Sequence, residues 1–440
     1  MAPSRPNILL IICHDLGHHI GCYGVDTVRT PNLDRLASEG FLFKNSFCTA
    51  PQCSPSRAGL MYGRYPHSTG VLGLTHGGFA WEPHQTDRHV ASLLAEAGYQ
   101  TAMFGIQHVT SHPERLGFDH RSPSADSRKI ASEAVSFIEN WNSQDEPFYV
   151  HVGFFEPHRP FDHGGAQPDQ TNGVYVPPYL PQNQAARSEL AQIQGAINFI
   201  DGQIGRILDA LDSSGLSENT ITIFTADHGI AFPRAKCSLY DPGIEVALLM
   251  RWPAGGISGG RVLDELVSNV DVLPTLLQAT NVQPPANLHG RSFLPLLRSE
   301  SYEARTSVFA EKTYHTYYDP MRAVRTQRHK LLWNFDYTPQ IELPSDIIIG
   351  ATAHSLLYEW TGYKKAVELY DLQADPWELD DLADSQAHAE VRDDLTRRLL
   401  DWMRSTHDPL LDGAVPSPAY LTRIQMLREA QDRTQRGGSE

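Results

Sequence analysis

The sequence has few cysteines and no long hydrophobic run, and each absence excludes a class of protein. Its five cysteines form an odd, scattered set in 440 residues, without the Cys-x-x-Cys spacing of zinc sites and redox motifs. A disulfide framework is therefore not expected, and most of these cysteines are predicted to be buried small hydrophobes. The opening apolar run, Ile8 to Cys13, is too short to span a bilayer and lacks a signal-peptide cleavage region. We therefore expect a cytoplasmic protein with no membrane partner.

Basic residues are also in the minority. Lysine and arginine number 36 against 52 acidic residues, which gives a formal charge of -16 and a pI near 5.6. Nonspecific binding of nucleic acid depends on basic surface, so no nucleic-acid partner is expected. An anionic substrate would have to be attracted by a local site. The 41% hydrophobic and 20% charged content is that of an ordinary soluble globular protein.

The pattern of apolar residues predicts an α/β fold. The run from Asn7 to Cys13 is continuously β-branched or leucine-rich, as in a strand that is buried on both faces. Similar strands alternate with helical patterns, which favours a large, mostly parallel central sheet flanked by helices. The expected helices are 31–39, 91–97, 130–141 and 186–211, and the expected strands of this sheet are 7–13, 101–104, 148–154, 220–225, 247–250 and 308–310.

The length exceeds what one hydrophobic core usually serves, so we expect a second, smaller unit. Residues 1–300 are predicted to form the catalytic domain. After about Leu297 the apolar segments become shorter, which predicts a small antiparallel sheet and a terminal helix over 301–430. The expected elements are strands 321–325, 330–333 and 368–370 and helix 389–406. The polar stretch 431–440 is predicted to be a frayed tail.

Polar residues that can bind a metal ion or transfer a proton recur where the predicted strands end. In open α/β sheets, ligands bind beyond the carboxyl ends of the strands. Histidines and carboxylates that are scattered along the chain would therefore meet in one site. The residues at these strand ends are His14, Asp15, His108, His158, Asp227 and His228.

One cysteine has a local sequence that suggests chemistry. Ser54 and Pro55 are typical of a helix start, which would put Cys53 at the positive end of that helix. Arg57 follows about one turn later. Free backbone N–H groups together with a guanidinium favour a bound anion, and they predict a lowered pKa for the thiol.

The stretch Cys53 to Arg64, which reads CSPSRAGLMYGR, resembles the signature of the sulfatase family, within the alkaline phosphatase superfamily. Within that family the chain is most similar to the heparan N-sulfatase branch (N-sulfoglucosamine sulfohydrolases, or sulfamidases). The resemblance implies an alkaline-phosphatase-like α/β sandwich over most of the chain. Segments similar to the family are 6–8, 15–17, 30–34, 226–229, 269–271 and 289–292, and segments similar to the branch are 229–233, 238–240, 319–322 and 406–409.

The resemblance also implies a reaction. In the family this cysteine becomes formylglycine, so a formylglycine-generating enzyme would be a partner of Cys53 during maturation. A hydroxyl of the aldehyde hydrate would attack sulfur, and collapse of the hemiacetal would release sulfate. The expected substrates are small anionic sulfate esters or sulfamates, with N-sulfoglucosamine as a candidate.

By the same resemblance, one divalent metal ion would lie between the modified Cys53 and four other residues, His14, Asp15, Asp227 and His228. His14 occupies a position where the family carries aspartate. Two imidazoles and two carboxylates suit manganese, zinc or iron better than calcium, which is the usual family metal and prefers oxygen ligands.

The resemblance further assigns acid–base and anion-binding roles. His158 matches the histidine that protonates the leaving group, and His108 matches the one that assists hemiacetal breakdown. Arg57 and Lys236 match cationic residues that hold the anion. Substrate contacts are expected from His76 on a glycine-rich segment and from two residues of the small unit, His315 and Arg322.

One departure from the family pattern leaves alternatives open. Where sulfatases carry Gly-Lys-x-His, this chain has Gly105-Ile106-Gln107-His108, so one anion-binding ammonium is missing. A related formylglycine branch, the phosphonate monoester hydrolases and phosphodiesterases, also lacks that lysine. A phosphoryl substrate is therefore the rival hypothesis, and a noncatalytic sugar- or anion-binding protein is a third. A homo-oligomer is expected because large hydrolases of this kind often form dimers.

Overall fold

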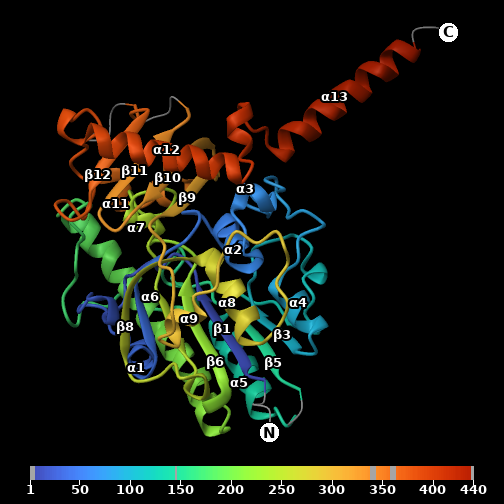
Figure 1. The fold of residues 1–440 in the computed structure, drawn as a ribbon, viewed down its shortest axis with the longest axis vertical. Coiled ribbons are helices and arrows are strands. Elements are labelled where there is room, and N and C mark those ends of the chain that lie inside the picture. The colour runs from blue at the N-terminus through green and yellow to red at the C-terminus, as the bar shows by residue number, and fades with distance from the viewer. Residues whose placement is uncertain (1–4, 144–145, 337–342, 357–362, 438–440) are drawn as a thin grey trace.

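The structure, a computed structural model, describes residues 5–143, 146–336, 343–356 and 363–437. Its largest element is a sheet with the strand order β4-β3-β5-β1-β6-β7-β2-β8 (Figure 1). Strand β7 is antiparallel to both of its neighbours, and the other pairs are parallel, so the predicted fold class is confirmed. The strands are β1 (Asn7–Cys13), β2 (Phe41–Phe47), β3 (Gln100–Gly105), β4 (His120–Ser122), β5 (Phe148–Gly153), β6 (Thr220–Ala226), β7 (Leu248–Arg251) and β8 (Arg261–Ser268).

Helices cover both faces of this sheet because its central strands are apolar on both sides. In β1, Leu9 and Ile11 enter one core, whereas Leu10 and Ile12 enter the other. The first core includes α1 (Pro31–Glu39), α5 (Ser127–Glu139) and α6 (Gln184–Ser213). The second includes α2 (Cys53–Tyr62), α4 (Val90–Glu96), α8 (Val272–Ala279) and α9 (Leu294–Leu297). Two short helices, α3 (Pro66–Thr69) and α7 (Asp241–Ile244), lie in connecting segments.

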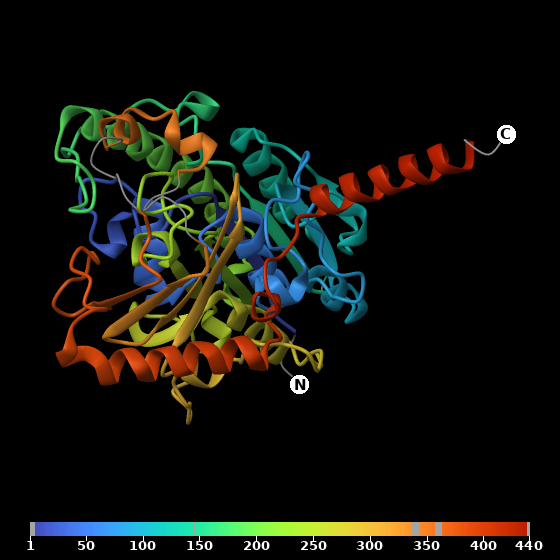
Figure 2. The ribbon, with the colours of Figure 1, turned by 90° about the horizontal axis from the view of Figure 1, so that it is seen from above.

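A second, antiparallel sheet has the order β12-β11-β10-β9. Its strands are β9 (Val308–Tyr314), β10 (Tyr318–Arg325), β11 (His329–Asn334) and β12 (Val367–Asp371). Helix α12 (Ala389–Ser405) runs along one face of this sheet (Figures 1 and 2). Leu399 and Trp402 of α12 share a core with Val324 and Leu331 of the sheet. This arrangement agrees with the small unit expected after residue 300, although the boundary itself stays a prediction.

One expectation about this region was wrong. Residues 308–310 do not extend the large sheet, because β9 pairs antiparallel with β10 in the small one. The segment 431–437 continues α13 (Pro418–Gly437), which projects from the body (Figures 1 and 2), and the frayed tail stays a prediction. Between 419 and 436 this helix has no glycine or proline and is rich in good helix formers. The last three residues of the predicted tail lie outside the described ranges.

A segment of the small unit also contacts a helix that covers the large sheet. After β11, the chain forms α10 (Ser345–Ile348) and α11 (Ala351–Leu356), and α11 packs against α6. The backbone N–H of Thr352 donates to the Glu189 carboxylate at 2.8 Å. This contact brings α10 close to the carboxyl ends of the large sheet. Among the helices of the described ranges, none is both long enough and apolar enough to cross a bilayer.

Candidate active site

The polar residues that follow the strands meet in one cluster. Strands β3, β5, β1 and β6 are neighbours and run parallel, so their carboxyl ends share one edge of the sheet. His14 and Asp15 follow β1, while His108, His158 and Asp227 follow β3, β5 and β6. The Asp15 backbone N–H donates to Asp227 Oδ1 at 3.0 Å across 212 positions of sequence. The structure therefore brings the predicted residues together.

The backbone at these strand ends is unusual. Gly105 has φ +86°, and a Cβ at this position would lie 2.0 Å from the carbonyl oxygen of Gly153. Only glycine allows β3 and β5 to approach so closely. Asp15 and His108 also lie in the left-handed region, with φ 47° and 57°. Backbone strain of this kind often accompanies functional sites, and here it turns both side chains toward the cluster.

Four buried side chains place potential metal-ligand atoms close together. One ligand atom from each of His14, Asp15, Cys53 and Asp227 lies within 4.8 Å of the others, and all four residues are at most 2% exposed. His14 Nδ1 lies 3.0 Å from Asp227 Oδ2, yet within the described chain neither His14 nitrogen has a hydrogen-bond partner. Burial, together with Arg57, lowers the pKa of His14 to about 4. A neutral imidazole and two carboxylates that converge in this way fit a divalent cation.

His228 is oriented to add a further nitrogen. Its Nδ1 lies 3.0 Å from the Gly229 carbonyl oxygen, to which it donates, so Nε2 faces the cluster. This Nε2 lies 3.1 Å from Asp15 Oδ1 and 3.3 Å from Cys53 Sγ. An imidazole nitrogen that lies this close to a carboxylate oxygen and a sulfur atom fits a metal ion.

Cys53 lies at the N-terminal end of a helix, as the sequence predicted, but the expected low pKa of its thiol was wrong. The helix, α2, begins at Cys53 and not at the Ser54-Pro55 pair, and its N-cap residue is Gln52, which has extended backbone and makes no side-chain capping bond. Burial raises the pKa of the Cys53 thiol well above its usual value against the nearby charge of Lys236, and the carboxylates of Asp227 and Asp15 act in the same direction as burial. A thiol that keeps its proton is a poor nucleophile. The site therefore contains no activated cysteine.

Arg57 presents unpaired donors to this cluster. Its side chain is fully buried, and Nε donates to Asp227 Oδ2 at 2.9 Å. Both terminal nitrogens are also buried, and neither has a hydrogen-bond partner in the parts of the chain that the structure describes. A buried guanidinium with four free N–H bonds is suited to bind two oxygens of a tetrahedral anion.

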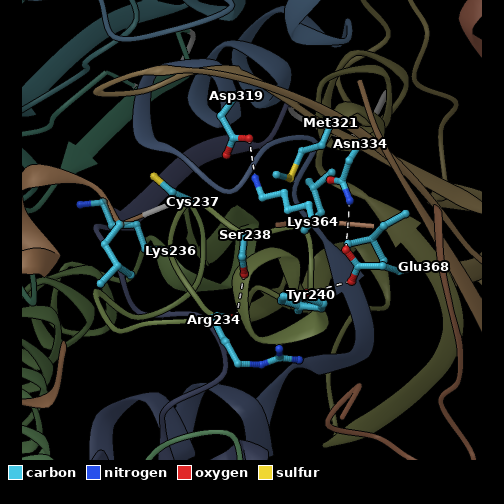
Figure 3. A pocket seen from close by; sticks show the side chains of 13 residues that line it. Arg234, Lys236, Cys237, Ser238, Tyr240, Asp319, Met321, Asn334, Lys364 and Glu368 are labelled. Carbon is cyan, nitrogen blue, oxygen red and sulfur yellow. Dashed lines mark hydrogen bonds and ion pairs between the residues drawn. The ribbon is translucent and has the colours of Figure 1, made fainter. Parts of the chain in front are cut away.

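Lys236 lies on the loop after β6 and joins three groups. Its Nζ lies 2.8 Å from Asp15 Oδ2, 2.6 Å from Asp346 Oδ2 and 3.2 Å from His158 Nε2. Burial alone would lower its pKa, but Asp15 and other nearby anionic groups raise it well above the usual value, so the ammonium stays charged. Figure 3 shows Lys236 apart from the neighbouring pair of Asp319 and Lys364. Lys236 therefore belongs to the polar cluster at the strand ends and not to that pair.

A cavity of about 720 Å³ opens beside the cluster. His14, His108 and His158 line one end of it, and Ile106 contributes to its wall. His76 also lines the cavity, and its Nδ1 lies 2.8 Å from His108 Nε2. The cavity is large enough for a small substrate. The branched alkyl group of Ile106 therefore stands at the site where the family pattern would supply an ammonium.

The two substrate contacts predicted from the small unit are not brought to this cavity. Arg322 is fully buried, and its guanidinium donates to both oxygens of Asp408, at 2.5 and 2.9 Å. The expectation that Arg322 contacts substrate is therefore wrong, because its side chain points from β10 toward the end of α12. His315 is 7% exposed and lines a separate small cavity with Cys237 and Asp319. Its role stays a prediction.

Several residues of the site had no signal in the sequence. Asp346 lies 110 positions after Lys236, in a segment without any recognised motif. Phe155 lines the cavity and lies against His14 with a centroid distance of 6.0 Å. Thr75 packs over the start of α2, where its N–H donates to Ser54 Oγ at 3.3 Å. Their positions depend on tertiary contacts that no local pattern encodes.

The convergent acceptors, the unpaired guanidinium and the buried ammonium define a hydrolase of anionic esters on an α/β sheet. The sequence model of the sulfatase family matches residues 6–282, and the model described as N-sulphoglucosamine sulphohydrolase, C-terminal, matches residues 229–347. The chain belongs to the sulfatase family and is a sulfate ester hydrolase.

Individual proteins agree with this assignment. The chain is 30% identical to human N-sulphoglucosamine sulphohydrolase, with 92% of this chain and 91% of the human protein covered. A solved structure of a 2-O GAG sulfatase has a TM-score of 0.74 at 24% identity and covers 94% of this chain and 95% of its own. The phosphonate monoester hydrolase of Agrobacterium radiobacter has a TM-score of 0.70 at 21% identity, with coverages of 91% and 96%. These two structures show the shared fold.

Proposed function

We propose that this protein hydrolyses sulfamates and sulfate esters with a formylglycine derived from Cys53, and that N-sulfoglucosamine is its substrate. The observation that carries the proposal is the position of Cys53. It lies at the N-terminus of α2, within 4.8 Å of the ligand atoms of His14, Asp15 and Asp227. A protonated thiol would be inert there, whereas an aldehyde hydrate would place a hydroxyl beside a metal ion and an arginine.

The metal and the aldehyde would each supply one kind of chemistry. A divalent cation held by His14, Asp15, Asp227, His228 and residue 53 would neutralise the anion and favour a deprotonated hydroxyl on the aldehyde hydrate. The chain's own residues would do the rest. Arg57 would bind two equatorial oxygens of the sulfuryl group through its free N–H groups, and Lys236 would hold a third oxygen.

Two histidines would move protons on opposite sides of the sulfuryl group. His158 Nδ1 lies 2.5 Å from the Arg159 carbonyl oxygen, which fixes the ring so that Nε2 faces the cluster. Burial lowers the pKa of His158, so the ring would act as an acid in its doubly protonated form, in which Nε2 gives a proton to the departing atom of the substrate. His108 would accept the proton of the second hydroxyl at position 53, and its contact with His76 would orient the ring.

The assignment of N-sulfoglucosamine rests on the match of residues 229–347 to the C-terminal model of N-sulphoglucosamine sulphohydrolase. This region contains Lys236 and Asp346, which lie on the side of the cluster where the leaving group would depart. The human relative covers both halves of the chain at 30% identity. The specificity for the substrate would therefore depend on residues 229–347, which contribute Lys236 and Asp346 to the site.

For the metal we propose manganese, zinc or iron in place of calcium. His14 replaces a carboxylate of the family pattern, and His228 presents Nε2, so two nitrogens enter the site. Nitrogen ligands favour these metals over calcium, which prefers oxygen ligands. Elemental analysis of protein purified without added metal tests this proposal. Stoichiometric calcium alone would refute it.

The test of the proposed reaction combines mass spectrometry with turnover. The tryptic peptide that contains Cys53 should carry the aldehyde or its hydrate after coexpression with a formylglycine-generating enzyme. That protein should release sulfate from glucosamine N-sulfate, and a Cys53→Ala variant should not. A modified, metal-loaded protein that releases no sulfate from either glucosamine N-sulfate or aryl sulfate would contradict the proposal.

A phosphonate monoester or phosphodiester is the second candidate substrate. The observation that favours it is Ile106, because an alkyl group at this position removes one ammonium from the anion site. A phosphonate monoester hydrolase also shares the fold. Parallel kcat/KM measurements with glucosamine N-sulfate, aryl sulfate and aryl phosphonate rank the candidates. A clear preference for the phosphonate would replace the first proposal with the second.

A further inference from the structure

Asp346 presents an unsatisfied carboxylate oxygen beside the catalytic cluster. It lies in α10 and reaches the cluster from the small unit, where its Oδ2 accepts a hydrogen bond from Lys236 Nζ at 2.6 Å. Its other oxygen, Oδ1, is buried and has no hydrogen-bond partner among the residues that the structure describes. Buried polar atoms without partners are rare in folded proteins, so this oxygen requires an explanation.

The local charges do not provide a partner. The Lys236 ammonium is shared between Asp346 Oδ2 and Asp15 Oδ2, which lies at 2.8 Å. One ammonium group therefore pairs with two carboxylates, so these three groups together keep an excess negative charge. A substrate group that donates a hydrogen bond would satisfy Asp346 better than one that carries only lone pairs.

The carboxylate lies close to the atom that would protonate the leaving group. His158 Nε2 is 3.7 Å from Asp346 Oδ2 and 3.2 Å from Lys236 Nζ. An atom that receives a proton from Nε2 must lie about 3 Å from it. The departing atom of a bound substrate would therefore lie near Asp346 as well as near His158.

The two classes of sulfuryl substrate differ at that departing atom. In a sulfamate, the bridging nitrogen carries a hydrogen, whereas the bridging oxygen of a sulfate ester carries only lone pairs. When the N–S bond breaks, its electron pair stays on nitrogen, which takes one proton from His158 and becomes an amine with two N–H bonds. When an ester S–O bond breaks in the same way, the oxygen becomes a hydroxyl with one O–H bond.

We propose that Asp346 is a specificity-determining residue that accepts the N–H of the sulfamate nitrogen and of the amine product. This proposal rests on the proposed function. An acceptor at this position attracts the N–H of a sulfamate, and it repels the bridging oxygen of an ester. Selection therefore uses both an attractive and a repulsive contact, which is the usual way to discriminate between substrates of equal size.

The test compares Asp346→Asn with wild-type protein that has the same formylglycine and metal content. The substitution keeps the shape but replaces one acceptor oxygen with an NH₂ donor. We expect kcat/KM for glucosamine N-sulfate to fall by about 10- to 100-fold, the cost of one lost hydrogen bond to a charged group. The value for aryl sulfate should not fall, because the NH₂ group no longer repels the bridging oxygen of the ester. Asp162 lines a second cavity, separate from the one beside the cluster, to which Asp346 also contributes. The Asp162→Asn variant therefore provides a matched control, and neither kcat/KM value is expected to change.

An equal loss with both substrates would overturn the proposal, because it would show that Asp346 only positions Lys236. Unchanged kinetics with both substrates would overturn it as well. A binding measurement separates this proposal from the proposed function. Calorimetric titration of glucosamine into the metal-loaded Cys53→Ala variant needs no turnover, and adding Asp346→Asn should weaken binding about tenfold. Equal affinities in the two proteins would refute the role of Asp346 even if the enzyme hydrolyses sulfamates.

Discussion

Replacing Arg57 with lysine should separate anion binding from folding. Lysine keeps the positive charge beside Asp227 but cannot present two parallel N–H groups to an anion. In the structure, both terminal nitrogens of Arg57 are buried and, among the described residues, lack a partner, while Nε already binds Asp227 at 2.9 Å. The variant should therefore keep much of the internal ion pair and lose the contact with substrate.

The size of the effect follows from the number of hydrogen bonds. Each hydrogen bond to a charged group contributes about 1.5–3 kcal/mol, so two bonds to the sulfuryl oxygens contribute about 3–6 kcal/mol. At about 1.4 kcal/mol per factor of ten, this range corresponds to about 10²- to 10⁴-fold in kcat/KM. A lysine ammonium would recover part of the loss, so we expect a decrease of about 10²- to 10³-fold for Arg57→Lys.

Arg322 offers a matched control. It is as fully buried as Arg57 and pairs with a carboxylate, Asp408, but it lies outside the site. Both Arg57→Lys and Arg322→Lys should lower the free energy of unfolding, by about 1–3 kcal/mol, as expected for lost bonds in a buried ion pair. Only Arg57→Lys should lower kcat/KM for aryl sulfate in protein of equal formylglycine content. Wild-type kcat/KM in Arg57→Lys, or an equal loss in Arg322→Lys, would refute the role given to Arg57.

Three further predictions concern the metal, the pH dependence of stability and the terminal helix. His14→Asp should shift the metal content toward calcium, because a nitrogen ligand becomes an oxygen ligand; elemental analysis that shows unchanged manganese, zinc or iron would contradict this. Burial raises the pKa of Glu378 to about 7 against the opposing charge of Lys330, so the folded protein binds more protons than the unfolded chain between about pH 4.5 and 7, and the contribution of this residue to stability should decline across that range and level off above it. Glu378→Gln should flatten this decline in thermal melts from about pH 4.5 to 8, and parallel curves would show that the residue does not cause it. Truncation after Ser417 should leave Tm and kcat/KM unchanged, because the side chains described in α13 are almost all exposed; a lower Tm would mean that the helix packs on the body.

The sequence predicted the large sheet and the residues at its strand ends because both depend on local patterns. The apolar run at 7–13 has the composition of a strand buried on both faces, and β1 has the same bounds. The residues after β1 and β6 could be expected to meet because parallel neighbouring strands end at one edge of the sheet. The position of Cys53 at the N-terminal end of a helix could also be predicted from Ser54 and Pro55, although the helix begins slightly earlier than these two residues indicate, with Gln52 as its N-cap.

Features that depend on long-range contacts could not be predicted. Arg322 belongs to a segment that resembles the sulfamidase branch, but only the packing of α12 on β10 shows that its guanidinium is bound by Asp408. The thiol pKa of Cys53 was expected to be low from its place at a helix start. In the structure, burial raises this pKa despite the nearby charges of Lys236 and Arg57. Asp346 reaches the site only because α11 packs on α6, and no spacing in the sequence indicates that contact.

The burial of Cys53 has a consequence for how active protein is made. The residue is 2% exposed and lies beneath other parts of the fold, so a second enzyme could not contact its side chain in the folded protein. If Cys53 is converted to formylglycine, as we propose, the conversion would have to take place while the segment is still extended. The active fraction of a preparation would then depend on a competition between modification and folding during synthesis. Protein that folds with an intact thiol would stay inactive until it is unfolded, however long it is incubated with the modifying enzyme.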